Sequence, residues 1–199
     1  PITEGQISFD GIELSALEGR SLKQFRHRMQ MIFQDPYASL NPRMTVYDTL
    51  AEPLLLHGLV NKAGLEQAIR ELMDNVGLAR AFVRKYPHEF SGGQRQRIAI
   101  GRALATRPEF IVADEPVSAL DVTIQAQILD LLADLTKEHG LTMLFISHDL
   151  AVIRQIADRI AVMYHGKLVE EGATAQVFET PQQDYTRSLL AAIPGANAA

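Results

Sequence analysis

Two adjacent carboxylates, Asp114 and Glu115, follow the apolar run at residues 110–113. Neighbouring carboxylates repel each other unless a cation lies close to them, and Mg²⁺ bound to a nucleotide would supply that cation. This arrangement suggests that Asp114 belongs to the shell of the metal and that Glu115 is the general base for an attacking water. A solvated turn at the end of a strand would also explain the pair.

A histidine and a glutamine also follow apolar runs of strand length. His148 comes at the end of the run at 141–147, and Gln34 follows the run at 29–33. A histidine in such a place can donate a hydrogen bond to a phosphate oxygen or to the water. A glutamine can bind Mg²⁺ through its carbonyl and orient the water. The alternatives are a histidine satisfied by its neighbours and an ordinary polar loop residue.

A helical pattern opens with Ser91, Gly92, Gly93 and Gln94. Glycines let the backbone come close to a ligand, and the N-terminus of a helix presents free N–H groups to an anion. The hydroxyl of Ser91 adds a donor, and Arg95 and Arg97 strengthen the positive field. The run therefore predicts a phosphate site, although a loop capped by a serine fits it as well.

The elements that must position these side chains indicate an α/β fold. The apolar runs at 29–33, 110–113 and 141–147 predict strands, the last two buried on both faces, and they alternate with helical patterns near 91–106 and 122–138. Such alternation predicts a mostly parallel sheet with flanking helices. Ligands bind at the carboxyl ends of parallel strands, so the acid pair and the histidine should share one rim.

The remaining elements follow from turn and capping signals. Near the N-terminus we expect a hairpin at 6–9 and 12–14, a helix capped by Ser21 that runs to about residue 28, and a loop at 34–42. A helix capped by Thr45 and a helix at about 65–76 should follow. Towards the C-terminus we expect strands near 160–164 and 167–170.

Composition narrows the class of protein. The chain has 199 residues and a formal net charge of −5, whereas most nucleic-acid-binding proteins carry a basic surface. It has no cysteine, which excludes disulfides, zinc bound by cysteine and iron–sulfur clusters. No apolar run approaches the ~18 residues that a membrane span requires. The composition is that of an ordinary globular domain.

In their order and spacing these residues resemble the ATP-binding subunit of an ABC transporter. Gln34 matches the Q-loop, residues 90–94 match the family signature, and residues 110–115 match the Walker B motif. Residues 118–121, Ser-Ala-Leu-Asp, match the D-loop, and His148 matches the H-loop. The signature is highly specific, and the resemblance extends over essentially the whole chain.

Three further runs resemble the dipeptide and oligopeptide importers of that family, at residues 33–43, 86–90 and 181–194. The resemblance implies a P-loop NTPase-like fold. It also implies an ABC ATPase domain at residues 1–180, with a helical subdomain at about 43–105. Residues 181–199 would begin the C-terminal extension of the peptide importers.

The same resemblance implies an ATPase that energises peptide import from the cytoplasmic face of the plasma membrane. Two such subunits form a head-to-tail dimer, and ATP with Mg²⁺ lies between the P-loop of one and the signature of the other. The signature residues of this chain would contact the partner's nucleotide, and Asp121 would lie at the dimer interface. The Q-loop region and the helical subdomain would receive helices of the permease subunits. A substrate-binding protein would deliver the substrate to those permease subunits. No nucleic acid is expected as a partner.

The sequence departs from the family in one motif, because it contains no P-loop pattern Gly-x₄-Gly-Lys-Ser/Thr. We expect that the chain starts after that motif and lacks a core strand of the fold, which would leave apolar surface exposed. Losing three charge-assisted hydrogen bonds of ~1.5–3 kcal/mol each would remove roughly 4–9 kcal/mol, or about three to six decades of affinity. The 199-residue chain alone should therefore neither bind ATP tightly nor hydrolyse it. Micromolar ATP binding in calorimetry would contradict this.

Two other functions remain open. A non-catalytic subunit could lend only its signature to a partner, which the absent P-loop favours and the presence of Glu115 and His148 opposes. An ABC ATPase of DNA repair or translation would usually have long insertions or two cassettes in one chain. Copurification with permeases rather than nucleic acid would separate that class from an importer.

Overall fold

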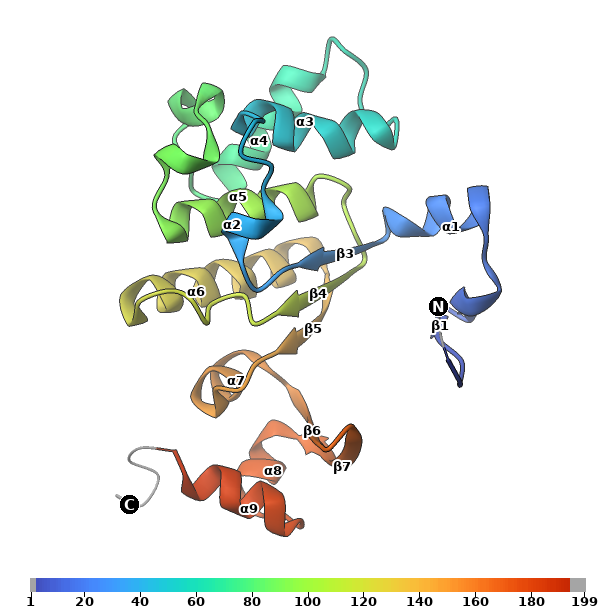
Figure 1. Cartoon of the computed structure of the whole chain (residues 1–199), viewed down its shortest axis with the longest axis vertical. Coiled ribbons are helices and arrows are strands. Elements are labelled where there is room, and N and C mark those ends of the chain that lie inside the picture. The colour runs from blue at the N-terminus through green and yellow to red at the C-terminus, as the bar shows by residue number, and fades with distance from the viewer. Residues whose placement is uncertain (1–2, 194–199) are drawn as a thin grey trace. The chain divides into compact units, whose positions relative to one another are not determined.

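The computed structural model describes residues 3–193 and divides into two compact units, Pro1–Leu144 and Phe145–Ala199. Figure 1 labels most of their helices and strands. The elements of the first unit are β1 (Ser8–Phe9), β2 (Ile12–Glu13), η1 (Leu14–Ala16), α1 (Gly19–Arg26), β3 (Met29–Ile32), α2 (Pro36–Ser39), α3 (Val46–Leu56), α4 (Leu65–Asn75), η2 (Arg80–Arg84), η3 (Pro87–Glu89), α5 (Gly92–Leu104), β4 (Phe110–Asp114) and α6 (Val122–His139).

The central sheet has the strand order β3-β4-β5, and the boundary between the two units falls within β5 (Thr142–Ile146). Strands β3 and β4 run parallel, with Met29 opposite Phe110 and Ile32 opposite Ala113. The fully buried Ile32 and Ala113 alternate with less buried neighbours, as side chains on the two faces of a strand do. The expected α/β class with a parallel sheet and flanking helices is confirmed.

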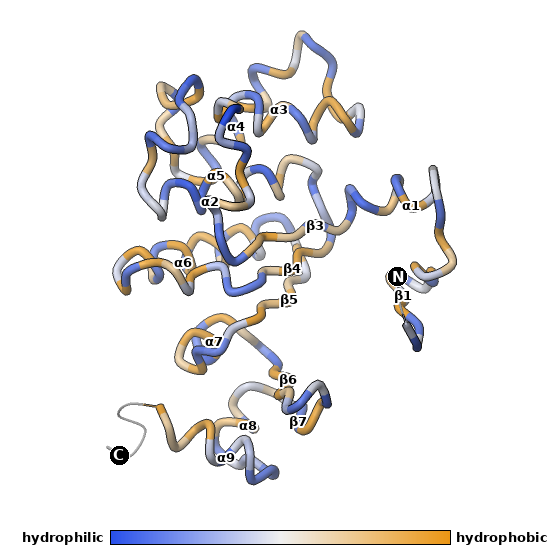
Figure 2. Tube along the Cα trace, viewed as in Figure 1, coloured by the Kyte–Doolittle hydropathy of each residue, from blue (hydrophilic) through white to orange (hydrophobic). Residues whose placement is uncertain are grey.

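Three apolar side chains on this sheet or just after its strands are exposed, whereas the missing core strand from which we expected such a surface stays a prediction. Met31 is 36% exposed, Phe33 is 45% exposed and Leu144 is 50% exposed. Helix α5 packs against β3, and α6 packs against α5. Figure 2 shows α6 alternating between hydrophobic and hydrophilic segments, as an amphipathic helix does.

Local signals account for most of the helix ends. Thr45 caps α3 through a reciprocal pair of hydrogen bonds with Asp48, and the helix continues through Pro53. Gly77 and Gly140 have φ values of 65° and 62°, which let the chain turn sharply just after α4 and α6. These ends agree with the sequence expectations.

Two local expectations are wrong. Helix α1 begins at Gly19 after Glu18, so Ser21 lies inside its first turn and cannot cap it. The expected loop at 34–42 contains the short helix α2, because the side chain of Asp35 accepts a hydrogen bond from the Tyr37 N–H (2.8 Å). Pro36 suits the first helical position, since the N–H it lacks would have no partner there.

The second unit contains the end of β5, α7 (Leu150–Ile156), β6 (Arg159–Tyr164), β7 (Lys167–Ala173), α8 (Thr174–Glu179) and α9 (Asp184–Ala191). Its core consists of Ile153, Ile160, Val162 and Val177.

The two strands that we expected near 160–164 and 167–170 are present as β6 and β7. They form a separate antiparallel pair. The turn between them consists of His165 and Gly166, both with positive φ (48° and 75°), and this turn type matches the twist of a hairpin. The domain boundary at 180/181 stays a prediction, and residues 194–199 of the expected extension lie outside the described residues.

Candidate nucleotide site

Gln34 and Glu115 meet although 81 residues separate them in the sequence. Gln34 follows β3 and Glu115 follows β4, and these parallel strands end together because Ile32 pairs with Ala113. The Gln34 Nε2 amide donates a hydrogen bond to Glu115 Oε2 at 2.8 Å. The sheet thus brings together the two residues that we expected to orient and activate a water.

The backbone turns sharply at Glu115, whose φ of 42° lies in the left-handed region. The backbone N–H and the hydroxyl of Ser118 both donate to the Glu115 carbonyl, at 3.2 and 3.1 Å. Non-glycine residues held in this region are strained, and such residues concentrate at functional sites. The turn fixes the direction in which the Glu115 carboxylate leaves the end of β4.

The oxygen atoms at this sheet edge fit a magnesium site. Because Gln34 donates through Nε2, its carbonyl oxygen Oε1 is left to bind a cation, and the half-buried Asp114 ends β4. Residues 3–193 contain no group of three or more histidine, aspartate and glutamate side chains placed for a metal ion. Mg²⁺ on a nucleotide does not require such a cage, since it keeps waters and phosphates and takes one or two protein ligands.

The N-terminus of α5 is built as the sequence predicts. The Ser91 hydroxyl oxygen accepts a hydrogen bond from the Gln94 N–H (3.3 Å), and the Ser91 N–H donates to the Gln94 side-chain carbonyl (3.1 Å). The hydroxyl proton of Ser91 can still be donated to an anion. The N-terminus of this 13-residue helix also adds the favourable end of a helix dipole.

The glycines of this helix have a packing role that the sequence did not reveal. A Cβ added to Gly93 would lie 2.4 Å from Cγ2 of Ile124, and one added to Gly92 would lie 3.3 Å from Cδ2 of Leu120. The start of α5 therefore packs directly against the start of α6 and the loop before it. Close approach to a ligand remains a second reason for glycine at these positions.

Asp121 is exposed and caps α6, because its Oδ1 accepts a hydrogen bond from the Ile124 N–H (3.0 Å). Sequence reasoning missed the residue that holds this loop. The side-chain amide of Gln125 donates to the carbonyls of Val117 and Leu120, at 3.0 and 3.1 Å. A glutamine in the first turn of a helix gives no local signal of such a role. The expected place of Asp121 at a dimer interface stays a prediction.

His148 belongs to the second unit, where it is exposed between β5 and α7. Its neighbour Asp149 caps α7 by accepting hydrogen bonds from the N–H groups of Ala151 and Val152. The proximity of His148 to Glu115 stays a prediction.

The arginines that follow the signature run are engaged in packing. Arg97 Nη1 donates to the Val76 carbonyl at the end of α4 (2.8 Å), and the Arg95 guanidinium lies over the Tyr37 ring. Their side chains tie α5 to its neighbours. Their expected contribution to a positive field near Ser91 stays a prediction.

Gln96, between these arginines, is fully buried, and within the described part of the chain neither polar atom of its amide has a hydrogen-bond partner. Because an unpaired buried polar group is unfavourable, Gln96→Met is expected to raise the free energy of unfolding by about 1–3 kcal/mol. Chemical denaturation measures this, with Gln67→Met on the exposed face of α4 as the control. A loss of stability would mean that a polar partner satisfies the amide.

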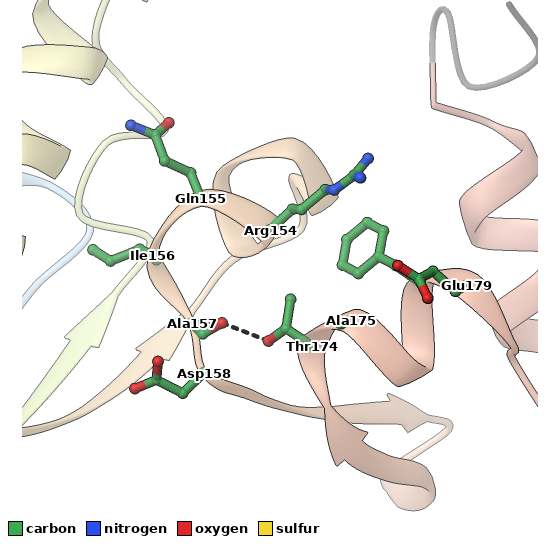
Figure 3. A pocket seen from close by; sticks show the side chains of 9 residues that line it. Arg154, Gln155, Ile156, Ala157, Asp158, Thr174, Ala175 and Glu179 are labelled. Atoms are coloured by element: carbon green, nitrogen blue, oxygen red, sulfur yellow. Dashed lines mark hydrogen bonds between the residues drawn. The ribbon is translucent and has the colours of Figure 1, made fainter. Parts of the chain in front are cut away.

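The polar cavity in the second unit, about 440 Å³ in volume, contains none of these residues. Figure 3 shows that α7, the turn after it and both ends of α8 line the cavity, with Thr174 donating a hydrogen bond to the Ala157 carbonyl. The Arg154 guanidinium lies 5.4 Å from the centre of the Phe178 ring.

The parallel sheet, the Gln34–Glu115 contact and the glycine-led helix α5 define an ABC-type nucleotide-binding domain. The profile of the ABC transporter family matches residues 1–118, and the chain belongs to that family.

Two solved structures have the same fold. The chain superposes with a TM-score of 0.76 on the dimeric ATP-binding cassette MJ0796 in a post-hydrolysis state bound to ADP and Pi (31% identity, 86% of this chain, 74% of that chain). It superposes with a TM-score of 0.79 on cbiO1 from Clostridium perfringens, part of the transporter complex cbiONQ (25% identity, 96% of this chain, 74% of that chain). The P-loop NTPase-like fold is thereby confirmed.

Two similar curated relatives are named for the transport of an oligopeptide and of glutathione. The chain is 56% identical over 194 residues to the oligopeptide transport ATP-binding protein OppF of Bacillus subtilis, covering 96% of this chain and 64% of that protein. It is 52% identical to the glutathione import ATP-binding protein GsiA of Pectobacterium atrosepticum, covering 98% of this chain and 31% of that protein. The chain therefore spans less than two thirds of the length of either relative.

Proposed function

We propose that this chain is the core of an ATP-hydrolysing subunit that energises a peptide importer. The observation that carries the proposal is the 2.8 Å hydrogen bond from Gln34 to Glu115, which joins the Q-loop and Walker B positions at one sheet edge. In the proposed reaction Glu115 takes a proton from the attacking water, and Gln34 orients that water. Bound Mg²⁺, held by Asp114 and Gln34, would neutralise charge on the phosphates of ATP.

The second half of each site would come from another subunit. The Ser91 hydroxyl and the N–H groups at the start of α5 can bind a phosphate. In this proposal the phosphate belongs to the nucleotide that the partner subunit holds. The similar cassette MJ0796 supports this arrangement of two subunits, because it is dimeric with ADP and Pi bound. His148 would donate to the γ-phosphate, and Asp121 would lie between the subunits.

Peptides are the proposed cargo, because two relatives that are 56% and 55% identical to this chain over 194 residues are named for oligopeptide transport. Among the helices of residues 3–193, none combines the length and the hydropathy needed to cross a bilayer. The proposed location is the cytoplasmic face of the plasma membrane, where permease subunits would hold the protein and a substrate-binding protein would supply the peptide.

A groove in the helical subdomain at about 43–105 is the proposed binding site for a helix of the permease. It has a volume of about 310 Å³ and is formed by α3, α4 and η2, with the buried Ile69 and Met73 as its floor. At its edge the Arg84 guanidinium lies 4.8 Å from the centre of the Tyr47 ring. An apolar floor with a charged edge fits the apolar face of an amphipathic helix.

Reading the gene upstream of Pro1 and assaying its full-length product tests the proposal. We expect a Gly-x₄-Gly-Lys-Ser/Thr motif there, Mg²⁺-dependent ATP hydrolysis, and copurification with permease subunits. An unrelated upstream sequence with no ATPase activity would favour the non-catalytic subunit that only lends Ser91 and its neighbours to a partner. Copurification with nucleic acid instead would favour an ABC ATPase outside transport.

A further inference from the structure

The short helix α2 is held against α5 by two arginine side chains. Arg102 Nη1 donates a hydrogen bond to the Ser39 carbonyl at 2.6 Å, across 63 residues of sequence. Two turns of helix closer to the signature, seven residues along α5, the Arg95 guanidinium carbon lies 5.3 Å from the centre of the Tyr37 ring. Figure 1 shows α2 lying against α5 just after the end of β3.

These contacts stabilise a helix that is too short to persist by itself. Helix α2 has four residues, so its end groups largely decide whether it forms. Asp35 satisfies its start, and the Ser39 carbonyl at its end is satisfied by Arg102. Positive charge is favourable at that end of a helix.

The position of Arg102 is unfavourable for a charge without a partner. Burial lowers the pKa of its guanidinium, and the nearby carboxylate of Glu52 acts in the opposite direction. A charge-assisted hydrogen bond to the Ser39 carbonyl offsets that loss of hydration. The arginine therefore fixes α2 and α5 to each other more firmly than an exposed contact would.

We propose that Arg102, with Arg95, is a positioning residue that couples the two ATP sites of the dimer through one chain. This rests on the proposed function. Gln34 lies three residues before Tyr37 and serves the chain's own site, whereas Ser91 at the start of α5 serves the partner's site. With α2 clamped to α5, a displacement of Gln34 moves Ser91 as well. ATP at one site then favours ATP at the other, which is positive cooperativity.

The full-length ATPase, assayed without membrane subunits over a range of ATP concentrations, tests this coupling. We expect a Hill coefficient above 1 for the wild type, and a fall toward 1 for Arg102→Met. Arg102→Lys should retain most of the cooperativity, because an ammonium can still donate to the Ser39 carbonyl. The control is Arg159→Met, in which the same change removes a 70% exposed side chain from β6.

If Arg102→Met fails to fold, a second pair of variants, at Tyr37, tests the coupling between the two ATP sites. Tyr37 is 61% exposed, so its replacement should leave the fold intact. Tyr37→Phe keeps a ring beneath Arg95 and should keep the cooperativity, whereas Tyr37→Leu should reduce it. An active wild type without cooperativity, or clamp variants as cooperative as the wild type, would overturn the coupling alone. A full-length protein without ATPase activity would overturn the proposed function and the coupling with it.

Discussion

Glu115→Gln is expected to lower the kcat of the full-length ATPase by about 10²–10⁴-fold, the usual contribution of a positioned general base. Glutamine keeps the size of the side chain and can still hydrogen bond to Gln34, but it cannot take a proton from the water. Steady-state release of phosphate measures the effect. ATP binding should survive, because the Glu115 carboxylate acts on the water rather than on the nucleotide.

The matched control is Glu138→Gln, which makes the same change at an exposed position near the end of α6. Its kcat should equal that of the wild type. If Glu115→Gln retained more than about a tenth of the activity, Glu115 would not be the base, since the loss would fall below the range for this role. The contact between Gln34 and Glu115 would then be structural.

Gly93→Ala should lower the free energy of unfolding by about 1–3 kcal/mol, the usual effect of overpacking. The added Cβ would lie 2.4 Å from Ile124 Cγ2, so the start of α5 must move away from α6. Because misplacing a group by ~1 Å can reduce a rate ~10²-fold, ATP hydrolysis in the full-length dimer should fall by about that factor. Thermal unfolding and phosphate release measure the two effects.

Adding Ile124→Ala to Gly93→Ala separates packing from ligand contact. This second change removes the Cγ2 atom with which the new Cβ collides, and it should restore most of the activity. Gly92→Ala is the matched comparison and should have a smaller effect, since its nearest atom is 3.3 Å away at the end of a leucine side chain. A double variant that folds normally yet stays inactive would show that Gly93 is needed for close approach to the nucleotide.

Much of the fold could be predicted because it depends on neighbours along the chain. Apolar runs identified β3, β4 and β5, and the capping roles of Thr45 and Ser91 follow from side chains within three residues. The same locality explains the two errors. Helix α2 was missed because Pro36 was interpreted as a breaker rather than as the first residue of a helix. Ser21 was assigned as the cap of α1, three residues after the true N-cap position at Glu18.

The meeting of Gln34 with Glu115 was also implied by sequence, because the carboxyl ends of neighbouring parallel strands coincide. The motifs, the family and the types of residue at the site are properties of the sequence alone. Only the tertiary structure decided that Arg102 holds Ser39, that Ile124 leaves no room beside Gly93, and that the Gln96 amide is buried without a partner. Such contacts depend on which helix faces meet in space, and the spacing of residues along one helix does not specify the side chain that a distant segment brings against it.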